Sequence, residues 1–264
     1  MKKALMYLLL ALGISLGVAF VGGAVISFSA GFIEGFNDGV NGVAPNGQTD
    51  SKTMILSSGM ILVLVACVIL NIVFLRLRYA SYTVGRIPGE MHWRVALWLA
   101  LAAAGLAIVY GMMYNPLTDS DEAVRSSYGW IKEHPLVSLS YLTLIEATGD
   151  LILFGGMLRE ILEWKHRPEI VIPVFGAVLA LFTAIFSSPF LMIPTMMLAT
   201  IEGWAYEYSR SVIPVIVCDW VFWIVMVCLM GISLPWWCLL IAAVMIVPGT
   251  YFAIKTMEPY KPID

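Results

Sequence analysis

Apolar stretches long enough to cross a bilayer alternate with short polar segments along most of the chain. A transmembrane α-helix needs about 20 predominantly apolar residues. Eight such stretches are expected to be helices, at residues 4–32, 53–75, 95–114, 136–162, 170–187, 190–206, 212–230 and 234–254. The pattern therefore predicts an all-α, polytopic membrane protein with about eight transmembrane helices, in a single membrane domain over residues 1–264.

The polar segments indicate where the chain leaves the membrane and how it is oriented. Residues 34–52 and 115–134 are rich in Gly, Asn or acidic side chains, so we expect them to be external loops. Under the eight-helix scheme, 12 of the 15 Lys and Arg residues fall on the opposite side. Because cytoplasmic loops carry such an excess, both termini are predicted to be cytoplasmic, in a bacterial cytoplasmic (inner) membrane.

The composition agrees with this picture and narrows the possible partners. The chain is 60% hydrophobic and 12% charged, whereas soluble domains are about 25% charged. Its net charge of -3 gives no basic field, so the lipid bilayer is an expected partner and nucleic acid is not. The cysteines show no CxxC or Cys/His ligand spacing, so we expect no cofactor.

Three acidic side chains, Glu146, Asp150 and Asp219, interrupt the apolar stretches with no basic residue beside them. An ionisable group inside a membrane is costly, which makes it a functional-site hypothesis by default. Glu146 and Asp150 are four residues apart, so they project from one face of the fourth helix, about one turn apart. Glu202 is similarly enclosed in the sixth helix. If these groups face one interior space, they could share a proton or a cation.

A purely structural role for the same acids is the alternative. Protonated carboxyl groups can fasten membrane helices through hydrogen bonds, here to hydroxyls such as those of Ser140, Thr143 or Thr148. For Glu202 taken alone, this structural role is favoured.

Between residues 138 and 223 the chain carries a series of short patterns. Gly149 to Gly155 lies in the fourth helix, Phe182 to Phe186 in the fifth, a Gly- and Tyr-containing segment at 202–214, and Asp219 to Trp223 in the seventh. This order resembles the CAAX-protease and bacteriocin-processing (CPBP) family of eight-helix intramembrane proteases. The corresponding motifs of that family are Glu-Glu-x-x-x-Arg-Gly, Phe-x-x-x-His and His-x-x-x-Asn or Asp.

Most of the catalytic side chains of that family are replaced here. Asp150 matches the second acid of the first motif, and Phe154 stands in place of its arginine. Phe186 and Asp219 replace the two histidines, and Trp223 replaces the final Asn or Asp. In the family, the glutamates and histidines activate a water, directly or with a metal, to hydrolyse a peptide bond. The resemblance therefore implies a CPBP-like bundle whose hydrolytic site has lost its imidazoles.

A catalytically degenerate relative of the family is the first of three functional hypotheses. Such a pseudoenzyme would bind a membrane-embedded peptide, lipid or partner protein without cleaving it. The remnant of its catalytic site would be Asp150, Asp219 and Glu146. The residues expected to contact its ligand are Glu202, Phe154, Phe186 and Trp223.

Two other functions use the same acids differently. In an active intramembrane hydrolase, Asp150 and Asp219 would hold a divalent cation or polarise water, and Glu146 would act as the base; two carboxylates suit magnesium or calcium better than zinc. In a small proton-coupled transporter, the same three acids would form the coupling site. Convergence of these acids with Glu202 is the geometric observation that bears on all three hypotheses.

Overall fold

The computed structural model describes residues 2–41, 50–78, 89–116, 129, 131–165, 167–186 and 189–258, and these contain helices and turns but no strand. The long helices are α1 (Lys2–Asn41), α2 (Asp50–Arg78), α3 (Gly89–Tyr114), α6 (Pro135–Ile152), α8 (Pro168–Phe186), α9 (Met192–Ser209), α10 (Ile213–Leu229) and α11 (Cys238–Met257). Three short elements complete the order: the π-helical turn η1 (Leu153–Leu158), helix α7 (Arg159–Lys165) and the 3-10 turn η2 (Pro189–Leu191).

Each of the eight predicted apolar stretches contains a helix. Among the described residues, five helical spans are long and apolar enough to cross a membrane: Leu9–Phe28, Ser58–Leu77, Trp93–Tyr114, Pro135–Trp164 and Cys238–Met257. Pro168–Phe182 and Ile213–Leu229 are apolar but shorter, and α9 carries two acids, Glu202 and Glu207. The all-α architecture, with five of the eight predicted spans of sufficient length, is consistent with an integral membrane protein.

The external loop predicted at residues 34–52 is wrong at both ends. Helix α1 continues to Asn41 and α2 already begins at Asp50, which leaves only residues 42–49 outside the described residues. Gly, Asn and Asp each cost a helix no more than about 1 kcal/mol, and no proline occurs before Pro45 to stop it. Most of the second predicted loop, at 115–134, lies outside the part of the chain that is described.

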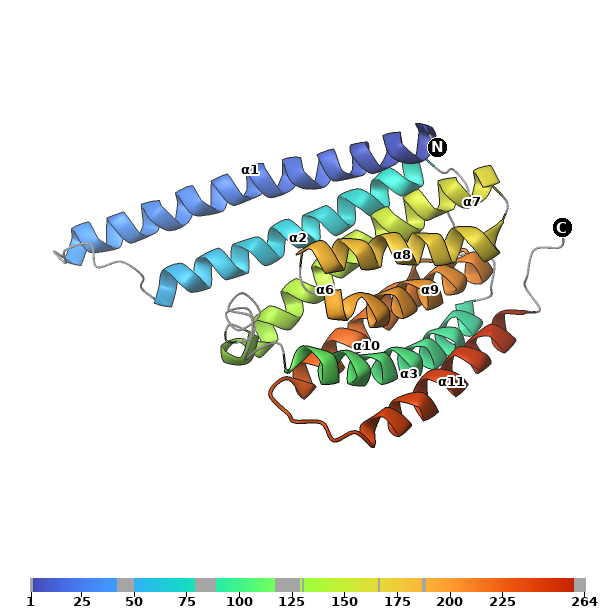
Figure 1. Cartoon of the computed structure of the whole chain (residues 1–264). Helices are drawn as coiled ribbons and strands as arrows, with labels where there is room; N and C mark the ends of the chain where they lie inside the picture. Colours follow the sequence, from blue (N-terminus) through green and yellow to red (C-terminus); the bar gives the residue numbers. More distant parts are fainter. Residues whose placement is uncertain are drawn as a thin grey trace.

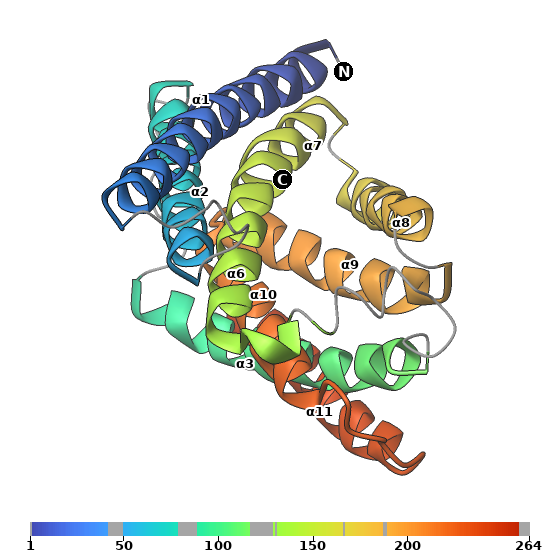
Figure 2. The same cartoon turned by 90° about the vertical axis from the view of Figure 1, so that its left-hand side faces the viewer.

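Helix α6 occupies the middle of the bundle, between two helical pairs. The α1–α2 hairpin lies on one side of it and the α8–α9 pair on the other, while α3 and α11 cross below (Figure 2). Helix α10 packs against both α6 and α3, and α3 packs closely along α11. This arrangement brings α3, α6, α8, α9 and α10, which are far apart in sequence, around the interior.

Glycines allow close helix contacts in the bundle, among others between α3 and α11 and at the turn η1. A Cβ added at Gly105 of α3 would lie 2.8 Å from the Ala242 carbonyl oxygen of α11, and one at Gly249 would lie 2.7 Å from that of Trp98. Small residues of this kind let membrane helices approach closely. The second place is the turn η1, where a Cβ added at Gly156 would overlap the Tyr7 ring of α1.

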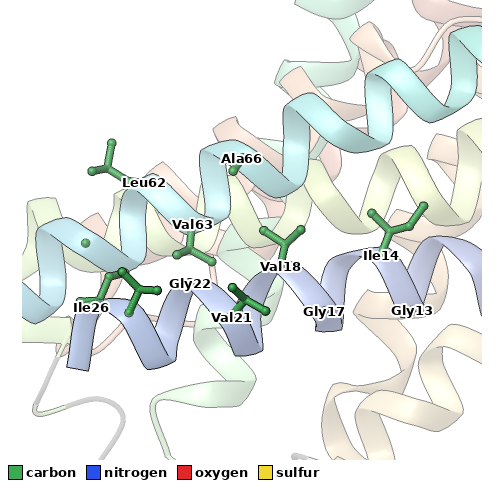
Figure 3. A pocket seen from close by; sticks show the side chains of 12 residues that line it. Gly13, Ile14, Gly17, Val18, Val21, Gly22, Ile26, Leu62, Val63 and Ala66 are labelled. Carbon is green, nitrogen blue, oxygen red and sulfur yellow. The ribbon is translucent and has the colours of Figure 1, made fainter. Parts of the chain in front are cut away.

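A long apolar groove runs between α1 and α2 on the periphery of the bundle. It has a volume of about 770 Å³ and is lined by glycines and aliphatic side chains, among them Gly17, Val18 and Val63 (Figure 3). A Cβ added at Gly13 or Gly17 would meet no atom within 4 Å. The groove is therefore open, and none of its described lining residues is acidic or basic.

Helix ends that carry basic residues gather at one end of the bundle. The N-terminal ends of α1, α3 and α8 and the C-terminal ends of α2, α7, α9 and α11 all lie toward the same side (Figure 1). The basic side chains near these ends include Arg76, Arg94, Arg167, Arg210 and Lys255. The described part of the bundle thus has a basic end.

Candidate functional site

Four acidic side chains from three helices line one cavity inside the bundle. Glu146 and Asp150 come from α6, Glu202 from α9 and Asp219 from α10, and the cavity has a volume of about 290 Å³. Asp150, Glu202 and Asp219 are only 3%, 3% and 5% exposed, so they are withdrawn from bulk solvent. The structure therefore brings together all four acids that the sequence analysis singled out, in a cavity that we call the acidic chamber.

The local sequence explains the position of the two acids on α6 and the irregular helix that follows them. Glu146 and Asp150 are four residues apart on a regular helix, so both face the chamber as their spacing predicts. Immediately afterwards the backbone widens into the π-helical turn η1, which contains Gly155 and Gly156. Turns of this type occur frequently at functional sites, and here the turn directs Phe154 into the chamber wall.

Asp219 is the central member of the acidic cluster. Its carboxyl group lies close enough to those of Asp150 and Glu202 to interact with both. An ionised carboxylate only accepts hydrogen bonds, whereas a protonated one also donates. A hydrogen bond between two of these carboxyl groups would therefore need one of them to be protonated.

Glu146 has a different partner. Its Oε1 accepts a hydrogen bond from the indole Nε1 of Trp223 at 3.0 Å. One turn earlier on α10, the indole of Trp220 donates to the Thr143 carbonyl oxygen at 3.1 Å. Two tryptophans of α10 thus fasten that helix to α6 beside the chamber.

The hydroxyl groups proposed as fasteners for the acids do not serve them. The side chains of Ser140, Thr143 and Thr148 donate to the Leu136, Leu139 and Leu144 carbonyls of their own helix, each at 2.9 Å. Meanwhile Asp150 Oδ2 and Glu202 Oε1 are buried and meet no amide, hydroxyl or cationic donor among the described groups. These hydroxyls therefore donate within α6, and the bond between helices that the structure shows for one of the acids is the one from Trp223 to Glu146.

Aromatic rings form much of the remaining wall of the chamber. They belong to five residues: Tyr110, Phe154, Phe182, Phe222 and Trp223. No Lys, Arg or His of the described chain lines the cavity. Two nearby arginines have carboxylate partners elsewhere, since Arg159 pairs with Glu163 at 2.9 Å and Arg210 with Glu207 at 2.7 Å. The acids of the chamber therefore have aromatic neighbours and no cation.

The positions compared with the CPBP motifs meet around the same cavity. Asp150, Phe154, Phe182, Asp219 and Trp223 all line it. The side chain of Phe186, at the end of α8, lies outside what is described, so its predicted contact with a ligand stays a prediction. The described acids, histidines and cysteines form no group of three or more arranged to hold a metal ion.

No protein-family model, curated protein or solved structure matches this chain. The site is therefore interpreted from its own geometry.

Several residues of the chamber were not found from the sequence. They are Tyr110 on α3, Leu153 on η1, Leu179 on α8, Thr195, Leu198 and Ala199 on α9, and Phe222 on α10. All lie in apolar helices, where such residues are common and carry no signal of a site. Glu202, for which a structural role was favoured, belongs to the cluster because α9 crosses beneath α8 and reaches Asp219.

The chemistry available in the chamber is that of carboxyl groups, a phenol and one aliphatic hydroxyl. Tyr110 and Thr195 supply the two hydroxyls, and the described lining residues include no imidazole. Hydrolytic sites that work near neutral pH commonly use histidine as the general base. The chamber can accept hydrogen bonds and hold positive charge more readily than it can activate a nucleophile.

Proposed function

We propose that this chain is a CPBP-like integral membrane protein that binds a membrane-embedded ligand in the acidic chamber without hydrolysing it. The observation that carries the proposal is the convergence of Glu146, Asp150, Glu202 and Asp219 on one cavity, with no imidazole among the described residues that line it. A cavity with a few convergent polar groups in an apolar wall is typical of a binding site.

The resemblance to the CPBP motifs supports this proposal through the replaced residues. Where that family has an arginine and a final Asn or Asp, Phe154 and Trp223 line the chamber. These substitutions exchange polar catalytic groups for large aromatic surfaces. Such a change favours contact with an apolar ligand over activation of water.

Hydrolysis by the carboxyl groups alone is the second candidate, because Asp150 of α6 and Asp219 of α10 lie close together in the chamber. Aspartic proteases use two carboxyl groups that share one proton. In this chamber, however, Glu202 also lies beside Asp219. A third acid therefore interacts with Asp219, which would have to position the attacking water.

The orientation of the chain is part of the same proposal. We infer that both termini face the cytoplasm and that the protein resides in a cytoplasmic (inner) membrane. The gathering of basic helix ends on one side of the bundle supports this, since cytoplasmic loops are enriched in Lys and Arg.

A cleavage assay separates binding from hydrolysis. The full chain is reconstituted in lipid vesicles with a model transmembrane peptide, and peptide products are followed by mass spectrometry. We expect no cleavage by the wild type. Cleavage that is lost in Asp150→Asn and kept in Glu169→Gln, an exposed acid at the start of α8, would refute the proposal and establish carboxyl-based hydrolysis.

A further inference from the structure

The acidic chamber holds buried acceptor atoms for which the described chain supplies no donor group. Asp150 Oδ2 and Glu202 Oε1 both belong to residues that are 97% buried and line the cavity. Leaving such an atom unpaired in an apolar interior costs about 1–3 kcal/mol in proteins. A ligand that donates hydrogen bonds would remove this cost.

We propose that the ligand of the chamber is an organic ammonium cation with a compact apolar body, such as an arylalkylamine. This inference rests on the proposed binding function and names the chemical class of its ligand. It would bind with its ammonium group among the carboxyl groups of Asp150, Glu202 and Asp219 and its apolar body against the aromatic wall.

Charge complementarity favours a cation over other ligands. Four acids line the chamber with no positive side chain among the described residues that line it. An ammonium group presents three donors and no acceptor, which matches acceptor atoms that lack donors. An anion would add repulsion to a cluster of four acids, and a neutral alcohol would supply a single donor without the charge.

The aromatic wall provides a second, independent preference. Trp223, Phe222 and Tyr110 line the chamber on the side of α10 and α3, and Phe154 and Phe182 line it on the side of η1 and α8. Phe222 meets the Tyr110 ring edge-on with centroids 5.3 Å apart, and it meets Trp223 in the same way at 5.5 Å. Aromatic faces attract cations, Trp most strongly, and they also bury apolar surface.

The size of the chamber limits the body of the ligand. Its volume is about 290 Å³, roughly twice that of the 150 Å³ apolar cavity known to bind benzene. One aromatic ring with a short alkylamine fits this space. A transmembrane helix, about 10 Å wide with its side chains, does not fit within it.

A comparison of three probes of similar shape tests the charge requirement. Binding of 2-phenylethylamine, neutral 2-phenylethanol and anionic 3-phenylpropanoate to the purified full chain in detergent is measured by calorimetry near pH 7, where the amine is protonated. We expect the amine to bind at least about tenfold more tightly than the alcohol, the scale of a hydrogen bond to a charged group. The anion should not bind.

Variants locate the binding in the chamber. Glu202→Gln and Asp219→Asn should each weaken amine binding by about tenfold or more, while leaving alcohol binding little changed. Both replace a buried acid by a neutral isostere, which spares the fold a buried charge, and thermal unfolding checks that each variant is folded. Glu169→Gln, at an exposed position of α8, should bind like the wild type.

Equal affinity for amine and alcohol, or amine binding unchanged in both acid variants, would overturn the inference. Those outcomes would leave the proposed function standing, because they would not show peptide cleavage. Cleavage in the vesicle assay would instead refute the proposed function, whatever the amine does.

Discussion

The acidic chamber and the α1–α2 groove are both bounded by apolar helices, yet they differ in composition and in enclosure. The groove is larger, about 770 Å³ against about 290 Å³, but its lining, as far as it is described, includes no acidic or basic residue. Only 6% of the α1 segment Leu9–Phe28 is buried inside the protein, whereas Asp150, Glu202 and Asp219 are almost fully buried. The volume of a cavity alone therefore does not identify a binding site in a membrane protein, since lipid can fill an apolar groove.

The largest difference in stability is expected between two glycine substitutions, one in the packed interior and one in the open groove. Gly156→Ala should destabilise the protein by about 1–3 kcal/mol, the usual cost of overpacking, because the added Cβ would overlap the Tyr7 ring. Gly13→Ala should be neutral or stabilising by up to about 1 kcal/mol, since it improves helix propensity and meets no atom within 4 Å. Equilibrium unfolding in mixed detergent micelles measures both changes.

An equal change in the free energy of unfolding for both substitutions would contradict this difference between interior and groove. It would mean that α1 does not pack on η1 through Tyr7 and Gly156.

The next largest change in stability is expected when an indole hydrogen-bond donor is removed beside the chamber. Trp223→Phe keeps an aromatic ring but leaves Glu146 Oε1 without its donor at 3.0 Å. We expect a loss of about 1–2 kcal/mol in the free energy of unfolding. The double variant Trp223→Phe with Glu146→Leu should recover most of that loss, because it removes the acceptor as well. A double-mutant cycle that shows no coupling between these residues would contradict the contact.

The smallest change in stability is expected for a side-chain hydrogen bond between α1 and α2. The Asn71 side chain donates to Ser15 Oγ at 3.0 Å. Hydrogen bonds between membrane helices average about 0.6 kcal/mol, so Ser15→Ala should reduce stability by about that amount in the same unfolding measurement. It should leave amine binding unchanged, and weaker binding would show that the hairpin and the chamber are coupled.

The helices were predictable from the sequence because apolar length decides them. The alternation of apolar and polar stretches located a helix in each of the eight expected places. The loop prediction at 34–52 failed because Gly, Asn and Asp weaken a helix without ending it. The π-helical turn after Asp150 has no pattern of its own, since the two glycines that occupy it are common in membrane helices.

The chamber was predictable only in part. The four-residue spacing of Glu146 and Asp150 placed them on one face, and their unpaired acidic character marked them together with Asp219. The inclusion of Glu202 depended on how α9 crosses the bundle, which no local pattern specifies. Aromatic and small residues such as Tyr110 and Ala199 were missed because their contribution arises only where distant helices meet.

The convergence of α6 and α10 at their acids is the claim on which both proposals rest, and cross-linking measures it directly. Asp150→Cys and Asp219→Cys are combined in a chain whose native cysteines are replaced by alanine, then treated with a short bis-methanethiosulfonate reagent. Intact mass spectrometry distinguishes one bridging reagent from two singly attached ones. The structure predicts a single bridge for this pair and two separate attachments when Asp150→Cys is paired with Leu240→Cys on the exposed face of α11. Two separate attachments on the chamber pair would contradict the account.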